Sequence, residues 1–246
     1  MSPAVLAALA VVALAAFTTE GAIGFGGTVI AATLGAQLVP LAVLLPAFVP
    51  LNLVLSSWLL ARGWRAVAWR LLAAEVAPPV TVGAAVGLAL FHLPGTIWLS
   101  LAFGVFVVGL AALQLGRPGD RPLALGYRLV LLGLGGVAHG LFGTGGPMIV
   151  YVVRRRLPDK HAFRATLAVL WLVLNTALLV NFASAGLYTR RLVPVAGVLA
   201  GAIVPGLVLG DRIHRRLEAS RFERVVWMLL LVTGAALALR SAFALR

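Results

Sequence analysis

Glu20 and His139 are the residues of this sequence best suited to move protons, because each is an ionisable side chain within a long apolar run. A group that ionises at membrane depth is costly to bury and is a functional candidate by default. Apolar surroundings favour the neutral form of an acid, so Glu20 could carry a proton. Histidine changes its charge near neutral pH, so His139 could act as a switch. The alternative is that one or both side chains lie at a membrane surface or cap a helix end.

Three further polar side chains interrupt apolar segments. Glu75 precedes Pro78 and Pro79, which bend a helix and free backbone carbonyls, so Glu75 is either a third proton-coupling candidate or a structural residue. Asn52 and Asn175 stand in otherwise apolar stretches of the two halves of the chain. An amide in such a helix either hydrogen-bonds another helix or lines a pathway.

A glycine-rich motif occurs twice, and each copy directly follows one of the two proton candidates. Residues 20–27 read EGAIGFGG and residues 139–146 read HGLFGTGG, so four glycines recur after 119 residues. Glycine costs about 1 kcal/mol relative to alanine inside a helix. The repeated cluster therefore predicts an unwound backbone at the same place in two duplicated halves. Glycine-interrupted apolar segments at matching positions of two halves are the best sequence indication of a transporter's binding site.

Each predicted break is followed by the start of a helix, whose free N–H groups and positive dipole end favour an anion. Unpaired backbone groups are tolerated within a bilayer only where they are buried in protein or line a wet cavity. We therefore expect the two helix starts to face one shared cavity across a pseudo-two-fold axis. The alternative is that the glycines only allow helices to pack closely. The candidate substrate-binding residues are Gly24, Gly26, Gly27, Thr28, Gly143, Thr144, Gly145, Gly146, Asn52 and Asn175.

The composition indicates an integral membrane protein. Of the 246 residues, 62% are hydrophobic and 11% are charged, with a mean hydropathy of +1.06, whereas soluble domains carry about 25% charged residues. The net charge of +13 lies in short loops between apolar runs, which argues for membrane orientation and against nucleic-acid binding. No nucleophile–base pair, phosphate-binding lysine motif or metal-ligand spacing stands out, so the sequence predicts neither an enzyme nor a cofactor.

The expected fold is an all-α polytopic membrane protein with about 8 spanning helices and two glycine-broken or partial segments. Residues 1–116 and 126–246 would form two inverted-topology repeats of one membrane domain, joined by a cytoplasmic linker at 117–125. The expected elements are 4–18, 24–45, 46–61, 70–91 and 97–115 in the first half, and 127–138, 143–153, 162–185, 192–209 and 222–239 in the second.

The basic residues predict the orientation. Four segments, 62–70, 116–128, 154–164 and 211–224, hold 16 of the 20 Lys and Arg residues. Basic loops stay in the cytoplasm, so both termini are expected outside the cell inner (plasma) membrane. The first 17 residues lack the basic region of a signal peptide, so we expect them to form a retained helix.

The two glycine motifs, at 20–27 and at 140–147, resemble those of the TauE/SafE family of sulfite and sulfonate exporters, and the resemblance extends over essentially the whole chain. The second motif, GLFGTGGP, is the more specific, whereas Thr28 stands where a third glycine is common in the first. The resemblance implies a secondary exporter of sulfite, a sulfonate or a related small anion, with proton coupling as a further expectation. A passive anion channel and a non-transporting accessory subunit are the alternatives, and the sequence leaves homodimer formation open.

Overall fold

A computed structural model describes residues 1–91, 96–116, 124–143, 146–157, 159–216 and 219–244. These residues form helices and connecting turns, with no strand among them. The first half contains α1 (Pro3–Ile23), α2 (Gly27–Gly35), α3 (Leu41–Gly63), α4 (Trp69–Leu71), α5 (Ala77–Phe91) and α6 (Thr96–Gly116). The second half contains α7 (Leu125–Phe142), α8 (Gly146–Arg156), α9 (Lys160–Ser184), α10 (Val193–Arg216) and α11 (Ala219–Ala244).

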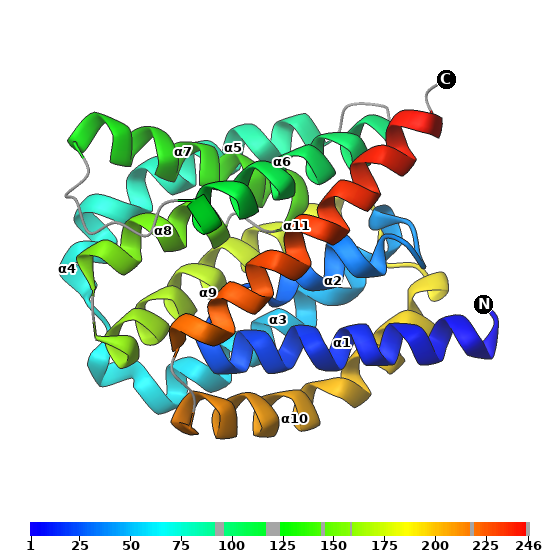
Figure 1. Cartoon of the computed structure of the whole chain (residues 1–246), viewed down its shortest axis with the longest axis horizontal. Helices are drawn as coiled ribbons and strands as arrows, with labels where there is room; N and C mark the ends of the chain where they lie inside the picture. The colour runs from blue at the N-terminus through cyan, green and yellow to red at the C-terminus, as the bar shows by residue number, and fades with distance from the viewer. Residues whose placement is uncertain (92–95, 117–123, 144–145, 158, 217–218, 245–246) are drawn as a thin grey trace.

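The long helices run side by side along the longest axis of the molecule (Figure 1). Six helical segments in the described part are long and apolar enough to cross a membrane: Pro3–Ile23, Leu41–Ala66, Trp69–Leu90, Leu125–Phe142, Lys160–Ser184 and Arg190–Arg216. Helices α6 and α11 have 21 and 26 residues. The two short helices, α2 with 9 residues and α8 with 11, fall well below the roughly 20 that a span needs. The expectation of an all-α polytopic membrane protein is confirmed.

Several predicted boundaries were wrong. Helix α1 continues beyond the predicted end at 18 to Ile23, so it includes Glu20. The stretch 24–45 is not one broken element, because α2 ends at Gly35 and α3 begins at Leu41, after Pro40. Both Pro46 and Pro50 lie inside α3, since neighbouring helices in a membrane can satisfy the carbonyls that a proline leaves unpaired.

The predicted helix 70–91 contains a widened turn. The segment Leu72–Val76 is a π-helix placed directly before α5, whose first turn holds Pro78 and Pro79. A π-turn inserts one extra residue per hydrogen-bonded ring. The widened turn therefore lies where the two missing proline N–H groups interrupt the regular helical ladder.

The helices pair across the two halves of the chain. Helix α1 packs along α10 and α5 along α7, while α3 packs on α9 and α6 on α11. Each pair joins one helix from 1–116 to one from 126–246, so the halves are interlocked. Residues 117–123, which make up most of the predicted linker, lie outside the described residues.

Glycines allow two of these pairs to approach closely. A Cβ built on Gly83 of α5 would come within 3.0 Å of the backbone of Gly133 in α7, and one built on Gly210 of α10 would do the same at Gly21 in α1. Small residues at membrane helix interfaces let backbones come together in this way. Packing thus accounts for Gly140, the first glycine of the second motif, whose Cβ would lie 2.4 Å from the carbonyl oxygen of Ala84, whereas a Cβ on Gly21 would make ordinary contacts at 3.5 Å.

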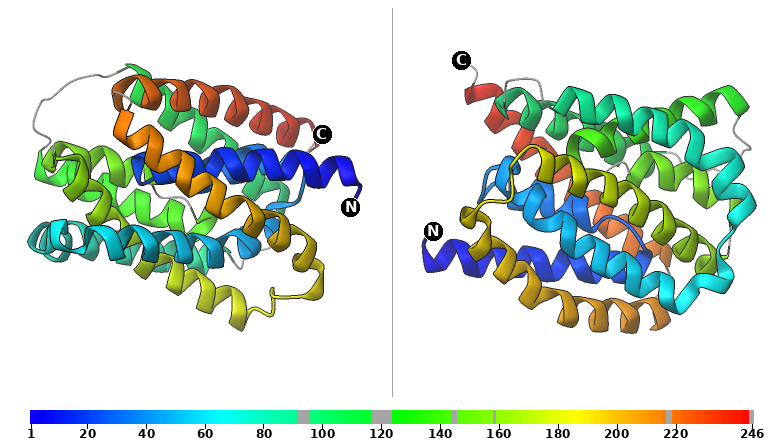
Figure 2. Two further views of the ribbon diagram at one scale, coloured as in Figure 1. Left: turned by 90° about the horizontal axis from the view of Figure 1, so that it is seen from below. Right: turned by 180° about the vertical axis from the view of Figure 1, so that it is seen from behind.

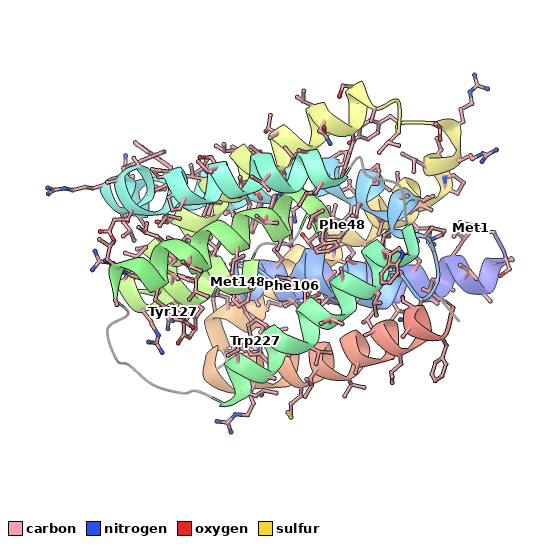
Figure 3. All side chains as sticks on the ribbon, turned by 90° about the horizontal axis from the view of Figure 1, so that it is seen from above. Met1, Phe48, Phe106, Tyr127, Met148 and Trp227 are labelled. Atoms are coloured by element: carbon pink, nitrogen blue, oxygen red, sulfur yellow. The ribbon has the colours of Figure 1, made fainter. Side chains whose placement is uncertain are left out.

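The bundle has two distinct ends. Both termini lie at the same end in all three views (Figures 1 and 2). The C-terminal ends of α3, α8 and α10, which carry many of the basic residues, lie toward the other end (Figure 1). Between the ends the interior is mainly apolar: Phe48 (Figure 3) is 1% exposed and stacks on Phe17 with ring centroids 5.1 Å apart.

Candidate anion site at the two helix breaks

The two helix breaks have the same backbone geometry. Helix α1 ends at Gly24, with φ of 91°, whose N–H donates to the carbonyl of Glu20 at 2.7 Å. Helix α7 ends at Gly143, with φ of 65°, whose N–H donates to the carbonyl of His139 at 2.7 Å. Such a left-handed residue closes a helix and favours glycine, because other side chains are strained there. The predicted break at the same place in each half is therefore present.

The helices after the breaks begin earlier than expected. Gly27 and Thr28 form the first turn of α2, and Gly146 begins α8, so these residues are helical rather than unwound. Gly26, with φ of 93°, is the residue just before α2. The candidates Thr144 and Gly145 lie outside the described residues.

The two breaks lie next to each other. A Cβ built on Gly143 would be 3.6 Å from Cγ2 of Thr28, and one built on Gly146 would be 4.0 Å from Cβ of Phe25. Trp171 of α9 joins them from the side, since its Nε1 donates to the carbonyl of Gly24 at 3.0 Å. The expectation of helix starts close to one another agrees with these contacts.

A chain of amide hydrogen bonds runs between the two halves. Nδ2 of Asn175 donates to Oδ1 of Asn52 at 2.8 Å, and Nδ2 of Asn52 donates to Oε1 of Glu20 at 2.9 Å. At its other end, Asn175 hydrogen-bonds the side chain of His139. The same Nδ2 of Asn52 also donates to Oγ1 of Thr28 at 3.2 Å. Both expected functions of the two amides, bonding between helices and lining a cavity, are combined here.

Glu20 and His139 lie in the interior and not at a surface. Each is 2% exposed, on the last turn of α1 and of α7. The imidazole of His139 stacks on Trp171, with ring centroids 5.7 Å apart and planes 8° apart.

The carboxyl group of Glu20 lies at the first turn of α2. Its Oε1 accepts from the same Nδ2 of Asn52 that donates to Oγ1 of Thr28, and a Cβ built on Gly27 would come 2.8 Å from Cβ of Glu20 and closer still to its Oε2. Glycine at this position therefore leaves room for the acid. The N-terminus of a helix attracts negative charge, so a side chain of the protein itself occupies the place predicted for an anion.

These groups surround a cavity of about 20 Å³. That is slightly more than the roughly 10–15 Å³ that one water molecule requires. A sulfur oxyanion is larger than water, so the cavity must widen to hold one. The lining residues are Glu20, Phe25, Gly26, Thr28, Val29, Asn52, His139, Gly143, Gly146, Trp171 and Asn175.

Glu75 does not belong to this cluster. Its carboxylate accepts from Arg128 of α7 at 2.9 Å and from Arg156 of α8 at 2.5 Å, and the side chain is 36% exposed. It therefore joins the π-turn before α5 to two other helices. Sequence reasoning missed Trp171, although a tryptophan one turn before Asn175 on the same helix face is a readable signal.

Comparison with known proteins identifies the family of this chain. The model of the family described as sulfite exporter TauE/SafE matches residues 8–237. One relative, described as "Probable inner membrane transporter protein TsaS" of Comamonas testosteroni, is 30% identical over 71% of this chain and 74% of its own length. Another, described as "Probable sulfite/organosulfonate exporter TauE" of Cupriavidus necator, is 26% identical over 91% of this chain and 89% of its own. No solved structure matches. With its apolar helices, the chain is a multi-pass membrane transporter rather than an enzyme, and it belongs to the TauE/SafE sulfite exporter family.

Proposed function

We propose that this protein exports sulfite or a small organosulfonate through the cavity between the two helix breaks. The observation that carries the proposal is the buried cluster of Asn52, Asn175 and Thr28 beside two helix starts. An oxyanion with several acceptor oxygens needs several donors in a dry site, and amide N–H, hydroxyl and helix N-terminal N–H groups supply them. The name of the Cupriavidus necator relative supports the same substrate class.

The size of the cavity favours a transporter with alternating access over a passive channel. A cavity of about 20 Å³ cannot hold the substrate as it stands, so binding requires the surrounding helices to move apart. Movement of one repeat against the other around a fixed site is the usual mechanism of secondary transporters.

We further infer that the halves are inverted repeats. Asn52 and Asn175, 123 residues apart, touch each other. Two equivalent residues can do so only near the axis that relates them. The pairing of α1 with α10 and of α5 with α7 supports a two-fold relation, because a two-fold axis carries the contact between first and fourth elements onto its counterpart. The inversion itself is inferred from the basic loops, which give each half an odd number of crossings.

Proton coupling at Glu20 follows from the position of its carboxyl group. An ionised carboxylate at the start of α2 competes with an anionic substrate for the same N–H groups and repels it. A protonated carboxyl group is neutral, so it no longer competes with the substrate for the helix N-terminus, and it can donate a hydrogen bond to the substrate. Protonation and anion binding are therefore expected to favour each other. His139, at the opposite end of the amide chain, is the second candidate for coupling.

The basic turns support a cytoplasmic location for the end at which they gather, which would place both termini outside. Under this orientation the substrate enters from the basic end and leaves from the end that carries the termini (Figure 1).

The test is transport by purified protein in liposomes loaded with sulfite or, separately, methanesulfonate. Wild-type protein should move both anions. Asn175→Ala removes a donor to the centre of the cluster and should lower the rate about tenfold or more, since a hydrogen bond to a charged group contributes about 1.5–3 kcal/mol. Thr176→Ala is the matched control, because Thr176 is exposed and its hydroxyl bonds only the Leu172 carbonyl in the described contacts. Absence of flux in wild type, or equal rates in both variants, would refute the proposal.

A further inference from the structure

A second cavity lies at the basic end of the bundle, apart from the cavity between the helix breaks. It has a volume of about 340 Å³ and is formed by the end of α3, the following turn Trp64–Ala66 and the first turns of α9. The lining residues are Leu59, Ala61, Arg62, Gly63, Trp64, Arg65, Ala66, His161, Arg164 and Ala165. We call it the arginine pocket. It has ample room for a small oxyanion and its first water molecules.

The charges of the arginine pocket are of one sign. Three guanidinium groups and one imidazole line it, and no acidic residue is among the described lining residues. The positive end of the α9 dipole adds to the same potential. Two carboxylates oppose it from outside: Asp159 caps the start of α9, and Asp211 lies 4.0 Å from Nη1 of Arg164.

Arg164 links the arginine pocket to the first helix break. Its side chain is 15% exposed, and its Nη1 donates to the carbonyl of Gly21 at 3.2 Å. The contact with Asp211 also uses Nη1, so neither contact involves Nε and Nη2, the pair of donors with which arginine binds an oxyanion in a fork. The guanidinium is thus fixed by one nitrogen on the side of α1.

One face of α9 connects the two cavities. Arg164, Trp171 and Asn175 follow one another at spacings of seven and four residues, which places them on the same side of a helix. Eleven residues of helix span about 16 Å. Arg164 lines the arginine pocket, whereas Trp171 and Asn175 line the central cavity.

The other half of the chain has no equivalent of this arginine. The shift of 123 residues that aligns Asn175 with Asn52 aligns Trp171 with Phe48 and Arg164 with Leu41. Phe48 and Leu41 are buried apolar residues of α3. The polar face is therefore a property of one end of the molecule and does not follow from duplication, which indicates a function specific to that end.

We propose that the arginine pocket is a second oxyanion site, at which Arg62, Arg65 and Arg164 hold the substrate anion before it reaches the central cavity. That the anion is a sulfur oxyanion rests on the function proposed above. The same chemistry would accept the phosphate of a lipid headgroup. A free anion is favoured because Arg164, which lines the pocket, also contacts the first helix break at Gly21 and Gly24.

Calorimetry of the full-length protein in phosphatidylcholine nanodiscs, with sulfite as the probe, tests the proposal. Wild type should bind sulfite at two sites. Arg62 and Arg65 are exposed, so replacing both by glutamine should leave the fold intact. The Arg62→Gln, Arg65→Gln double variant should bind sulfite about tenfold or more weakly at one of the two sites, because charged hydrogen bonds are lost. Arg70→Gln with Arg216→Gln removes the same charge from exposed residues outside the pocket and should change binding less than about twofold, as surface charges do.

Asn175→Ala separates this proposal from the proposed function. The Asn175→Ala protein should keep the site that the Arg62 and Arg65 substitutions weaken, even if sulfite is not the transported anion. In transport, the arginine variant should need about tenfold more sulfite for half-maximal rate and reach the same maximal rate, as expected when only a preceding site is lost. Unchanged sulfite binding in the arginine variant would overturn the proposal. The proposal would also be overturned if Arg62 and Arg65 were needed for binding phosphatidylglycerol but not for binding sulfite.

Discussion

Replacing the two left-handed glycines by alanine should have unequal effects, although the glycines hold equivalent positions. Gly24 and Gly143 both have positive φ, of 91° and 65°. Forcing an alanine into this conformation costs about 1–2 kcal/mol at each site. The surroundings differ. A Cβ at Gly143 would meet its nearest neighbours at 3.6 Å, which is ordinary contact, whereas a Cβ at Gly24 would lie 2.8 Å from Cγ and 3.3 Å from Cα of Arg164.

Steric overlap with a neighbouring residue should destabilise the Gly24→Ala variant but not the Gly143→Ala variant. The close atoms belong to the root of the Arg164 side chain: Cγ can move only with a change of χ1, and Cα only if α9 shifts. Overpacking of this kind costs about 1–3 kcal/mol. We therefore expect Gly143→Ala to lower the free energy of unfolding by about 1–2 kcal/mol and Gly24→Ala by about 2–5 kcal/mol. The assay is reversible unfolding in mixed micelles with increasing dodecyl sulfate, followed by circular dichroism.

A double-mutant cycle tests the physical reason. Arg164→Ala removes Cγ, so the double variant Gly24→Ala with Arg164→Ala should be more stable than the sum of the two single effects allows. Arg164→Ala combined with Gly143→Ala should be additive, because Arg164 is not among the nearest neighbours of Gly143. Equal losses for the two glycine variants, or additivity in the first cycle, would refute the reasoning.

Three further results are expected. Gly83→Ala should destabilise the protein by about 1–3 kcal/mol through the α5–α7 contact, whereas Gly109→Ala, which has no atom within 4 Å of its Cβ position, should be neutral or stabilising in the same unfolding assay. The chain has no cysteine, so the single variants Arg65→Cys and Arg191→Cys can each be labelled in intact cells. A membrane-impermeant thiol reagent should modify the Arg191→Cys protein and leave the Arg65→Cys protein unmodified. Modification of the Arg65→Cys protein would contradict the proposed orientation. The hydrogen bond from the Ala162 N–H lowers the pKa of Asp159, so the stabilisation from this helix cap is present at neutral pH and is lost as pH falls below 3.8. The Asp159→Ala variant should lack this acid-dependent loss when thermal unfolding is measured against pH. A variant with the same pH profile as wild type would argue against the cap.

The features that could be predicted from sequence are those that depend on local backbone physics. Gly24 and Gly143 identified the breaks because few other residues close a helix with positive φ. Asn52 and Asn175 were identifiable because an amide in an apolar helix needs a partner, and here each has the other. The identity of that partner depends on how α3 packs against α9, which no local pattern encodes.

The role of Glu75 shows where sequence reasoning stops. An acid in an apolar run suggested proton coupling, but its two arginine partners are 53 and 81 residues away in sequence. Arg164 was interpreted only as a charge that orients the protein, because its contacts with Gly21 and Gly24 arise from the tertiary structure, which brings this side chain of α9 to the end of α1. The end predicted for α1 at residue 18 was too early, since Glu20 lies within the helix and a buried acid with an amide donor is compatible with one.

The most direct test of the proposed mechanism is the pH dependence of methanesulfonate transport by the Glu20→Gln variant. The charge of this anion does not change from mildly acidic to mildly alkaline pH, so any pH dependence comes from the protein. Wild type should bind and move the anion better at lower pH, because protonation removes the negative charge of the carboxylate at the start of α2. Glutamine is neutral at every pH and should bind the anion at least as well, with no pH dependence and no acceleration by a pH gradient. A Glu20→Gln protein with the full pH response of wild type would contradict a role of Glu20 in coupling.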